Sequence, residues 1–182
     1  MDRRGPPAPQ EAMVIVISTA DFLWYVDTAL DQMVSIVTQL GDETASRRPD
    51  LEGANSPYAI LTHCLGVMEH WGGDMVAGRE IERDRDAEFR AEGAVTDLVT
   101  RTAVARRQLG ADMAGLEPLA VPRGIPDPAD ADIPLGRTQG GVLLHILEEL
   151  LQHLGQMEIS RDVLLAAGTD GGPEVQGASP QP

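Results

Sequence analysis

Near the end of the chain, the stretch EELLQHLGQ (residues 148–156) places a carboxylate and an imidazole four residues apart, at Glu149 and His153. In a helix, side chains at this spacing start about 5–6 Å apart on one face, so both can reach one metal ion. On a solvated helix surface the same pair would add only about 0.2–0.5 kcal/mol, which explains both residues without any function. His145 lies four residues before Glu149, so spacing alone leaves open which histidine is its partner.

The four histidines all fall in segments with a helical pattern: His63, His70, His145 and His153. About 12 Å of helix rise separates His145 from His153, so these two are not expected to share an ion. A third ligand must therefore come from another helix. His63 and His70 lie at the edge of an apolar stripe, where an ordinary hydrogen-bonded histidine is the more frequent explanation.

Apolar residues recur at helical spacing in four segments, which predicts four helices. The first runs from a cap at Asp21 to Gly41, and the second starts with Ser56 as cap and Pro57 as first helical residue. The charged stretch 79–93 predicts a loop or irregular turn, and the prolines of 117–137 predict a crossover loop. The remaining helices are expected over 95–116 and from a cap at Thr138 to about 168.

This pattern predicts an all-α protein, a four-helix bundle whose long connections allow a non-meander topology. Residues 12–167 form the expected domain, and the polar, proline-rich ends 1–11 and 168–182 are expected to be flexible tails. No convincing strand pair is present, although AMVIVIS (12–18) could be a short strand or a packed extension.

Composition excludes several classes of protein. The chain has 182 residues, 42% of them hydrophobic, and a formal net charge of −15, so nucleic acid and anionic membrane surfaces would repel it. No stretch approaches the roughly 20 apolar residues of a membrane span. The single cysteine, Cys64, cannot form an internal disulfide and falls in an apolar stripe. A cytoplasmic protein with no nucleic-acid or membrane partner is expected.

Three segments, in order, resemble the DinB-like metalloproteins: SPYAILTHCLGVMEHW (56–71), RDRDAEF (83–89) and EELLQHLGQMEISRD (148–162). The nearest branch is the one that resembles the mycothiol-dependent maleylpyruvate isomerase N-terminal domain. The resemblance implies a four-helix bundle of DinB-like topology. It also implies a divalent metal, held by a histidine of the second helix and an H-x-x-x-H-x-G-Q type motif of the fourth.

Carried over to this sequence, the resemblance makes His63, Glu149 and His153 the metal ligands, with Glu149 where many relatives have a histidine. His145 is then not a ligand. Two imidazoles and a carboxylate leave a further coordination position for water, thiol or substrate, as in catalytic zinc sites. Zinc is the expected metal, and nickel or another first-row ion would also suit these donors.

The resemblance further implies a low-molecular-weight thiol such as mycothiol. A metal lowers the pKa of a bound thiol, so the expected activity is thiol S-transfer to a small electrophile. The alternative is a non-catalytic, metal-binding or stress-related dimeric bundle. A homodimer is expected, because the leucine side of the fourth helix or residues 13–17 would need a cover.

Overall fold

A computed structural model describes residues 15–128 and 133–169, and every regular element within these ranges is helical. The prediction of an all-α protein is confirmed. The elements are α1 (Thr19–Ser46), α2 (Pro57–Val67), the π-helix η1 (Met68–Ala77), α3 (Arg85–Glu88), α4 (Val95–Asp112), the short 3₁₀ helix η2 (Met113–Gly115), α5 (Pro134–Arg137) and α6 (Gln139–Thr169). None of the described helices is both long enough and apolar enough to cross a membrane.

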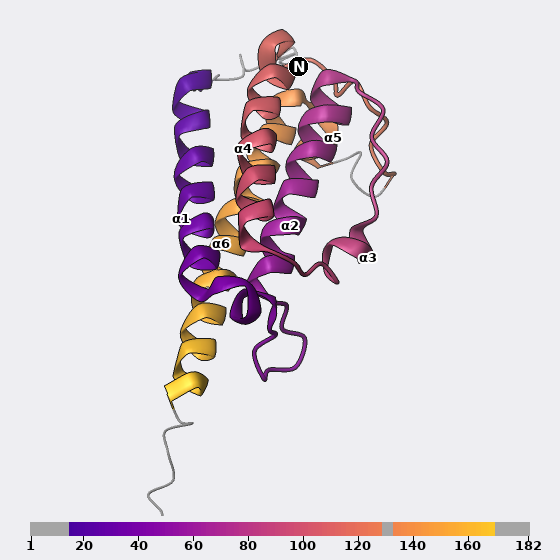
Figure 1. Cartoon of the computed structure of the whole chain (residues 1–182). Coiled ribbons are helices and arrows are strands. Elements are labelled where there is room, and N and C mark those ends of the chain that lie inside the picture. The colour runs from indigo at the N-terminus through magenta and orange to yellow at the C-terminus, as the bar shows by residue number, and fades with distance from the viewer. Residues whose placement is uncertain (1–14, 129–132, 170–182) are drawn as a thin grey trace, which may run out of the picture.

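Four long helical segments lie side by side as a bundle: α1, α2 continued by η1, α4, and α6 (Figure 1). Residue contacts join α6 to α1, α2 and η1, and they join α4 to the same three elements. Within the described ranges none joins α4 to α6, so these two helices occupy opposite positions in the bundle. The second and fourth predicted helices, α2 and α6, are therefore direct neighbours.

The helix boundaries follow local capping chemistry. Ser56 accepts a hydrogen bond from the Ala59 amide at 3.2 Å, and Thr138 accepts one from the Gly141 amide at 3.0 Å, which confirms both predicted caps. The first cap is different from the prediction. Ser18 lies three residues before Asp21 and accepts the Asp21 amide at 3.0 Å, so α1 begins before the predicted position.

Gly41 marks the predicted end of the first helix and has φ +70° and ψ 172°. This left-handed conformation favours glycine and breaks the helical path, although a further helical turn follows up to Ser46. The pair Gly72 and Gly73 does not end the second helix. The chain there widens into the π-helix η1, and Gly72 lies against Leu109 of α4, where a β-carbon would come 2.7 Å from Leu109 Cδ1.

The two apolar segments that were expected to need a cover differ in their surroundings. Residues 15–18 of AMVIVIS form no strand, and Ile15, Val16 and Ile17 are 79%, 88% and 61% exposed. Residues 12–14 of that stretch lie outside the described ranges. The leucine side of the fourth helix is mostly covered by the chain itself, because Leu143, Ile146, Leu150 and Leu154 of α6 are all buried.

Of the predicted tails, residues 1–11 and 170–182 lie outside the described ranges, and residues 168 and 169 form the end of α6. The predicted domain boundaries therefore stay a prediction. The crossover between α4 and α6 has no long helix, as its prolines predicted, and it holds only the short elements η2 and α5 among the residues described there.

Candidate metal centre

Three donor atoms from two helices meet where α2 packs against α6. Glu149 Oε2 lies 3.5 Å from His63 Nε2 and 3.3 Å from His153 Nε2. All three ligand atoms lie within 4.8 Å of one another. Bonds of about 2.0–2.1 Å in a tetrahedral zinc site place ligand atoms about 3.4 Å apart, so both measured pairs fit such an ion.

The protonation pattern of His63 supports this fit. Its Nδ1 lies 2.8 Å from Glu88 Oε2, and Arg83 donates hydrogen bonds of 2.8 and 2.9 Å to the two oxygens of Glu88. Burial opposes the ionisation of Glu88, but the hydrogen bonds from Arg83 and His63 outweigh burial and hold the pKa of this carboxyl below its ordinary value. An ionised carboxylate only accepts, so Nδ1 carries a proton, and whenever the ring is neutral its Nε2 presents a lone pair.

That lone pair has no hydrogen-bond partner within the described part of the chain, and the atom is buried. It lies opposite a carboxylate oxygen, so two acceptors are 3.5 Å apart with no donor between them. Such an arrangement is unfavourable in a low-dielectric interior unless a cation or a proton lies between the two atoms. A divalent ion would satisfy both acceptors, and the donor set therefore fits a metal.

His153 is oriented in the same way. Its Nδ1 donates to Gln156 Oε1 at 2.9 Å, which leaves its Nε2 free to face Glu149. Gln156 is the last residue of the HLGQ stretch and lies one turn after His153, so the motif supplies both the ligand and its support. Without a metal, the hydrogen bond with Glu149 raises the pKa of His153, although burial works against this effect.

Glu149 is the common partner of the histidines. The neighbouring imidazoles of His153 and His63 hold the pKa of its carboxyl far below the ordinary value, against the opposing effect of burial. Its other oxygen, Oε1, lies 3.9 Å from His145 Nε2. His145 also contacts Trp71 edge-on at 4.9 Å between ring centroids, and its Nδ1 lies 3.4 Å from Glu148 Oε2. His145 therefore lies next to the cluster, and the cluster of three ligand atoms does not include it.

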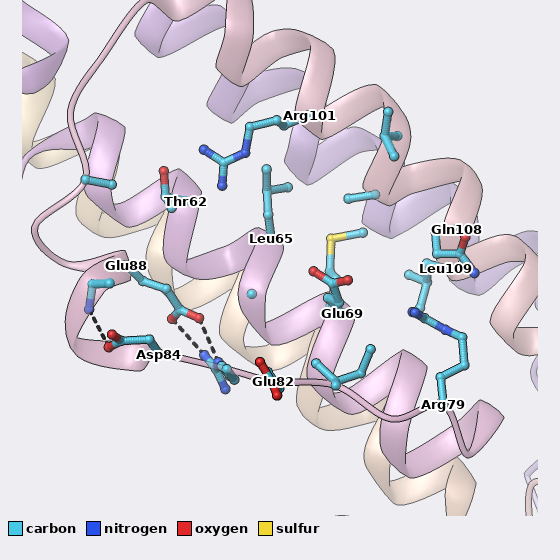
Figure 2. Close-up of a pocket in the computed structure, with 18 of the residues that line it drawn as sticks. Thr62, Leu65, Glu69, Arg79, Glu82, Asp84, Glu88, Arg101, Gln108 and Leu109 are labelled. Atoms are coloured by element: carbon cyan, nitrogen blue, oxygen red, sulfur yellow. Dashed lines mark hydrogen bonds and ion pairs between the residues drawn. The ribbon is translucent and has the colours of Figure 1, made fainter.

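A cavity of about 610 Å³ lies on the other side of His63, between α2–η1, α4 and the segment that follows η1. Figure 2 shows Glu88 at one part of this cavity, and Arg79 with Gln108 at another. Glu88 lines the cavity and contacts His63 through Nδ1, whereas the metal ligand atom is Nε2. This cavity and the metal-facing side of His63 are therefore different places.

The structure brings together all three residues that the resemblance named. His63 is buried, and Glu149 and His153 are half-buried. The alternative that Glu149 and His153 are a pair on a fully solvated helix surface therefore does not hold. His70 lies elsewhere, next to Trp71, and burial lowers its pKa. Burial also raises the pKa of the Cys64 thiol strongly, which agrees with its prediction as a core residue.

Sequence reasoning missed Glu88. The stretch 79–93 was expected to be a loop or irregular turn, and the structure places only the four-residue helix α3 in it. Within such a charged stretch, nothing in residue type distinguishes a buried carboxylate from its exposed neighbours. The only available signal was RDRDAEF as one of the three segments that carry the resemblance.

The chain matches a known protein family. A family model for the DinB superfamily matches residues 25–157, which include His63, Glu88, Glu149 and His153. The match spans most of the chain and agrees with the helical bundle. No curated protein and no solved structure matches the chain at a significant level.

Proposed function

Since the chain belongs to the DinB superfamily, whose members bind metals, we propose that His63, Glu149 and His153 hold one divalent ion, with zinc as the preferred metal. The observation that carries this proposal is the meeting of two imidazole Nε2 atoms and one carboxylate oxygen within 4.8 Å. Nitrogen and oxygen donors of this kind suit zinc, nickel and other first-row ions.

The proposed reaction is the transfer of a low-molecular-weight thiol, such as mycothiol, to a small electrophile. A bound metal lowers the pKa of a thiol, so that thiolate is available at neutral pH. The sulfur then forms a bond to an electrophilic carbon while the leaving group departs with its electron pair. Three protein ligands leave room for such a thiol, which supports catalysis over a purely structural role.

The residues of this chain contribute positioning. Gln156 holds the His153 ring, and Glu149 lies between the two imidazoles, so the ligand atoms already face one another before any ion binds. Cys64 follows His63 in sequence, but its thiol is fully buried with a strongly raised pKa. The attacking sulfur therefore belongs to the thiol cofactor in this proposal. A cytoplasmic location is part of the same proposal, because reduced thiols persist there.

The test begins with metal analysis of the protein purified without a histidine tag. A ratio near one ion per chain that falls in Glu149→Ala supports the site. A thiol-transfer assay with several low-molecular-weight thiols and a small electrophile then separates an enzyme from a binding protein. Metal binding without transfer would favour the non-catalytic alternative, and a metal-free protein that cannot be loaded would refute the site itself.

A further inference from the structure

His63 is held by a segment that is distant from both helices of the metal cluster in sequence. The stretch 83–89, which follows η1 and includes α3, supplies Arg83, Glu88 and Phe89. Glu88 contacts His63 Nδ1 at 2.8 Å, and Phe89 stacks on the imidazole with 4.4 Å between ring centroids and 27° between planes. One segment therefore contacts both the edge and the face of the same ring.

Arg83 fixes Glu88 in turn. Its Nε donates to Glu88 Oε1 at 2.8 Å and its Nη2 donates to Oε2 at 2.9 Å, so the pair is bidentate. The Arg83 side chain is only 17% exposed and that of Glu88 only 10%. Removing two charged groups from water is costly, and buried ion pairs often give little net stability compared with apolar residues. Stability of the fold is therefore a weak explanation for this pair.

Gly66 makes the position of Glu88 sterically allowed. It lies one turn after His63 on α2, directly beneath the carboxylate, and a β-carbon there would overlap Glu88 Oε1 and come 2.6 Å from Glu88 Cδ. Glycine is a poor helix former, so its use inside α2 is unfavourable locally. Gly110 within α4 is a control for Gly66, because it is also a glycine inside a helix but a β-carbon there would meet no atom within 4 Å.

We propose that Glu88, held by Arg83 and given space by Gly66, is the positioning residue that fixes the tautomer and the ring orientation of His63. The carboxylate keeps the proton on Nδ1 and thereby presents the Nε2 lone pair toward Glu149 and His153. This inference rests on the proposed metal site for its functional meaning. The tautomer of His63 that it predicts can be measured without any metal.

The first experiment measures zinc affinity of the full chain by competition with a chromophoric chelator. Glu88→Ala and Arg83→Ala should weaken zinc binding by about 10–100-fold, as expected when the partner of a ligating histidine is lost. Gly66→Ala should weaken it as well, although it removes no polar group, because it displaces the carboxylate. Gly110→Ala should leave the affinity unchanged. Glu88→Gln keeps an acceptor in place and should bind zinc more tightly than Glu88→Ala.

The second experiment separates positioning from stability and does not need metal. Long-range ¹H–¹⁵N spectra of the imidazole groups of the metal-free protein report the tautomer, at a pH where the ring is neutral. His63 should show Nδ1–H in the original protein and in Gly110→Ala, and should shift toward Nε2–H in Glu88→Ala. A purely structural role would lower the melting temperature and leave the tautomer unchanged.

The outcomes of the two experiments are distinguishable. If the original protein binds no zinc but shows the Nδ1–H tautomer that Glu88→Ala loses, the proposed metal site fails and the positioning role stands. If folded Glu88→Ala and Arg83→Ala proteins keep both the original affinity and the original tautomer, the positioning role is overturned. Should Gly66→Ala fail to fold, these two variants still decide the question.

Discussion

Replacing His153 by alanine should remove most of the metal-dependent stabilisation of the protein, whereas His145→Ala should leave most of it. Both histidines lie four residues from Glu149 on α6 and have similarly exposed side chains, at 17% and 16%. The distances differ, since His153 Nε2 lies 3.3 Å from Glu149 Oε2 and His145 Nε2 lies 3.9 Å from Glu149 Oε1. Only His153 also faces His63, with 4.9 Å between ring centroids.

The size of the effect follows from mass action. A ligand at about 100 times its dissociation constant stabilises the folded state by about 2.7 kcal/mol. For a chain of this size each kcal/mol raises the melting temperature by about 2–4 °C, so zinc should raise it by roughly 5–11 °C. Loss of one of three protein ligands should weaken binding by at least about 100-fold, more than loss of a supporting group. At the same zinc concentration, zinc then stabilises His153→Ala by only about 0.4 kcal/mol and raises its melting temperature by roughly 1 °C.

The assay is a thermal melt of each variant with and without zinc, so that every variant supplies its own metal-free baseline. Equilibrium dialysis on the same samples gives the bound metal per chain. A large zinc-dependent shift in His153→Ala together with none in His145→Ala would show that Glu149 pairs with the other histidine. Equal shifts in both variants and in Glu149→Ala would refute the reasoning that this cluster holds the ion.

Four further predictions concern other parts of the chain. Cys64→Ala should keep the full metal content and any thiol-transfer activity, measured in a folded protein, because its buried thiol is not the nucleophile. The pKa of Glu149 is lowered on folding, so its ionised carboxylate stabilises the metal-free protein above about pH 4.5. This contribution should be lost as the pH falls below that value. Urea denaturation at a series of pH values should therefore show a smaller loss of stability on acidification in Glu149→Gln than in the original protein. Ser56→Ala should cost about 1 kcal/mol in the free energy of unfolding, measured by urea denaturation, because the cap of α2 is lost. Light scattering at micromolar concentration should give the mass of a homodimer, and Val16→Asp should reduce it if the exposed residues Ile15–Ile17 form the interface; a strict monomer would remove this idea.

The second and fourth helices show how far local sequence information extends. Ser56 and Pro57 start α2, and Thr138 starts α6, through local interactions that span only a few residues. The local sequence is therefore sufficient to determine where these two helices begin. The four-residue spacing of Glu149 and His153, and the place of Gln156 one turn later, are equally local. Composition and hydrophobic periodicity were therefore sufficient for the all-α class, and local spacing was sufficient to place Glu149 and a histidine on one face of a helix.

Spacing alone could not choose between His145 and His153. The resemblance chose His153, and the tertiary structure gives the physical reason, because the helix offers Glu149 two equivalent neighbours and only the position of α2 distinguishes them. The resemblance named His63, but spacing on α2 could not separate it from His70. The role of Glu88 was even less accessible, since its partner lies 25 residues earlier in the chain and the contact needs the space above Gly66. Helical periodicity fixes which residues share a face of one helix, while the packing of helices and loops decides which faces meet and which charged side chains become buried.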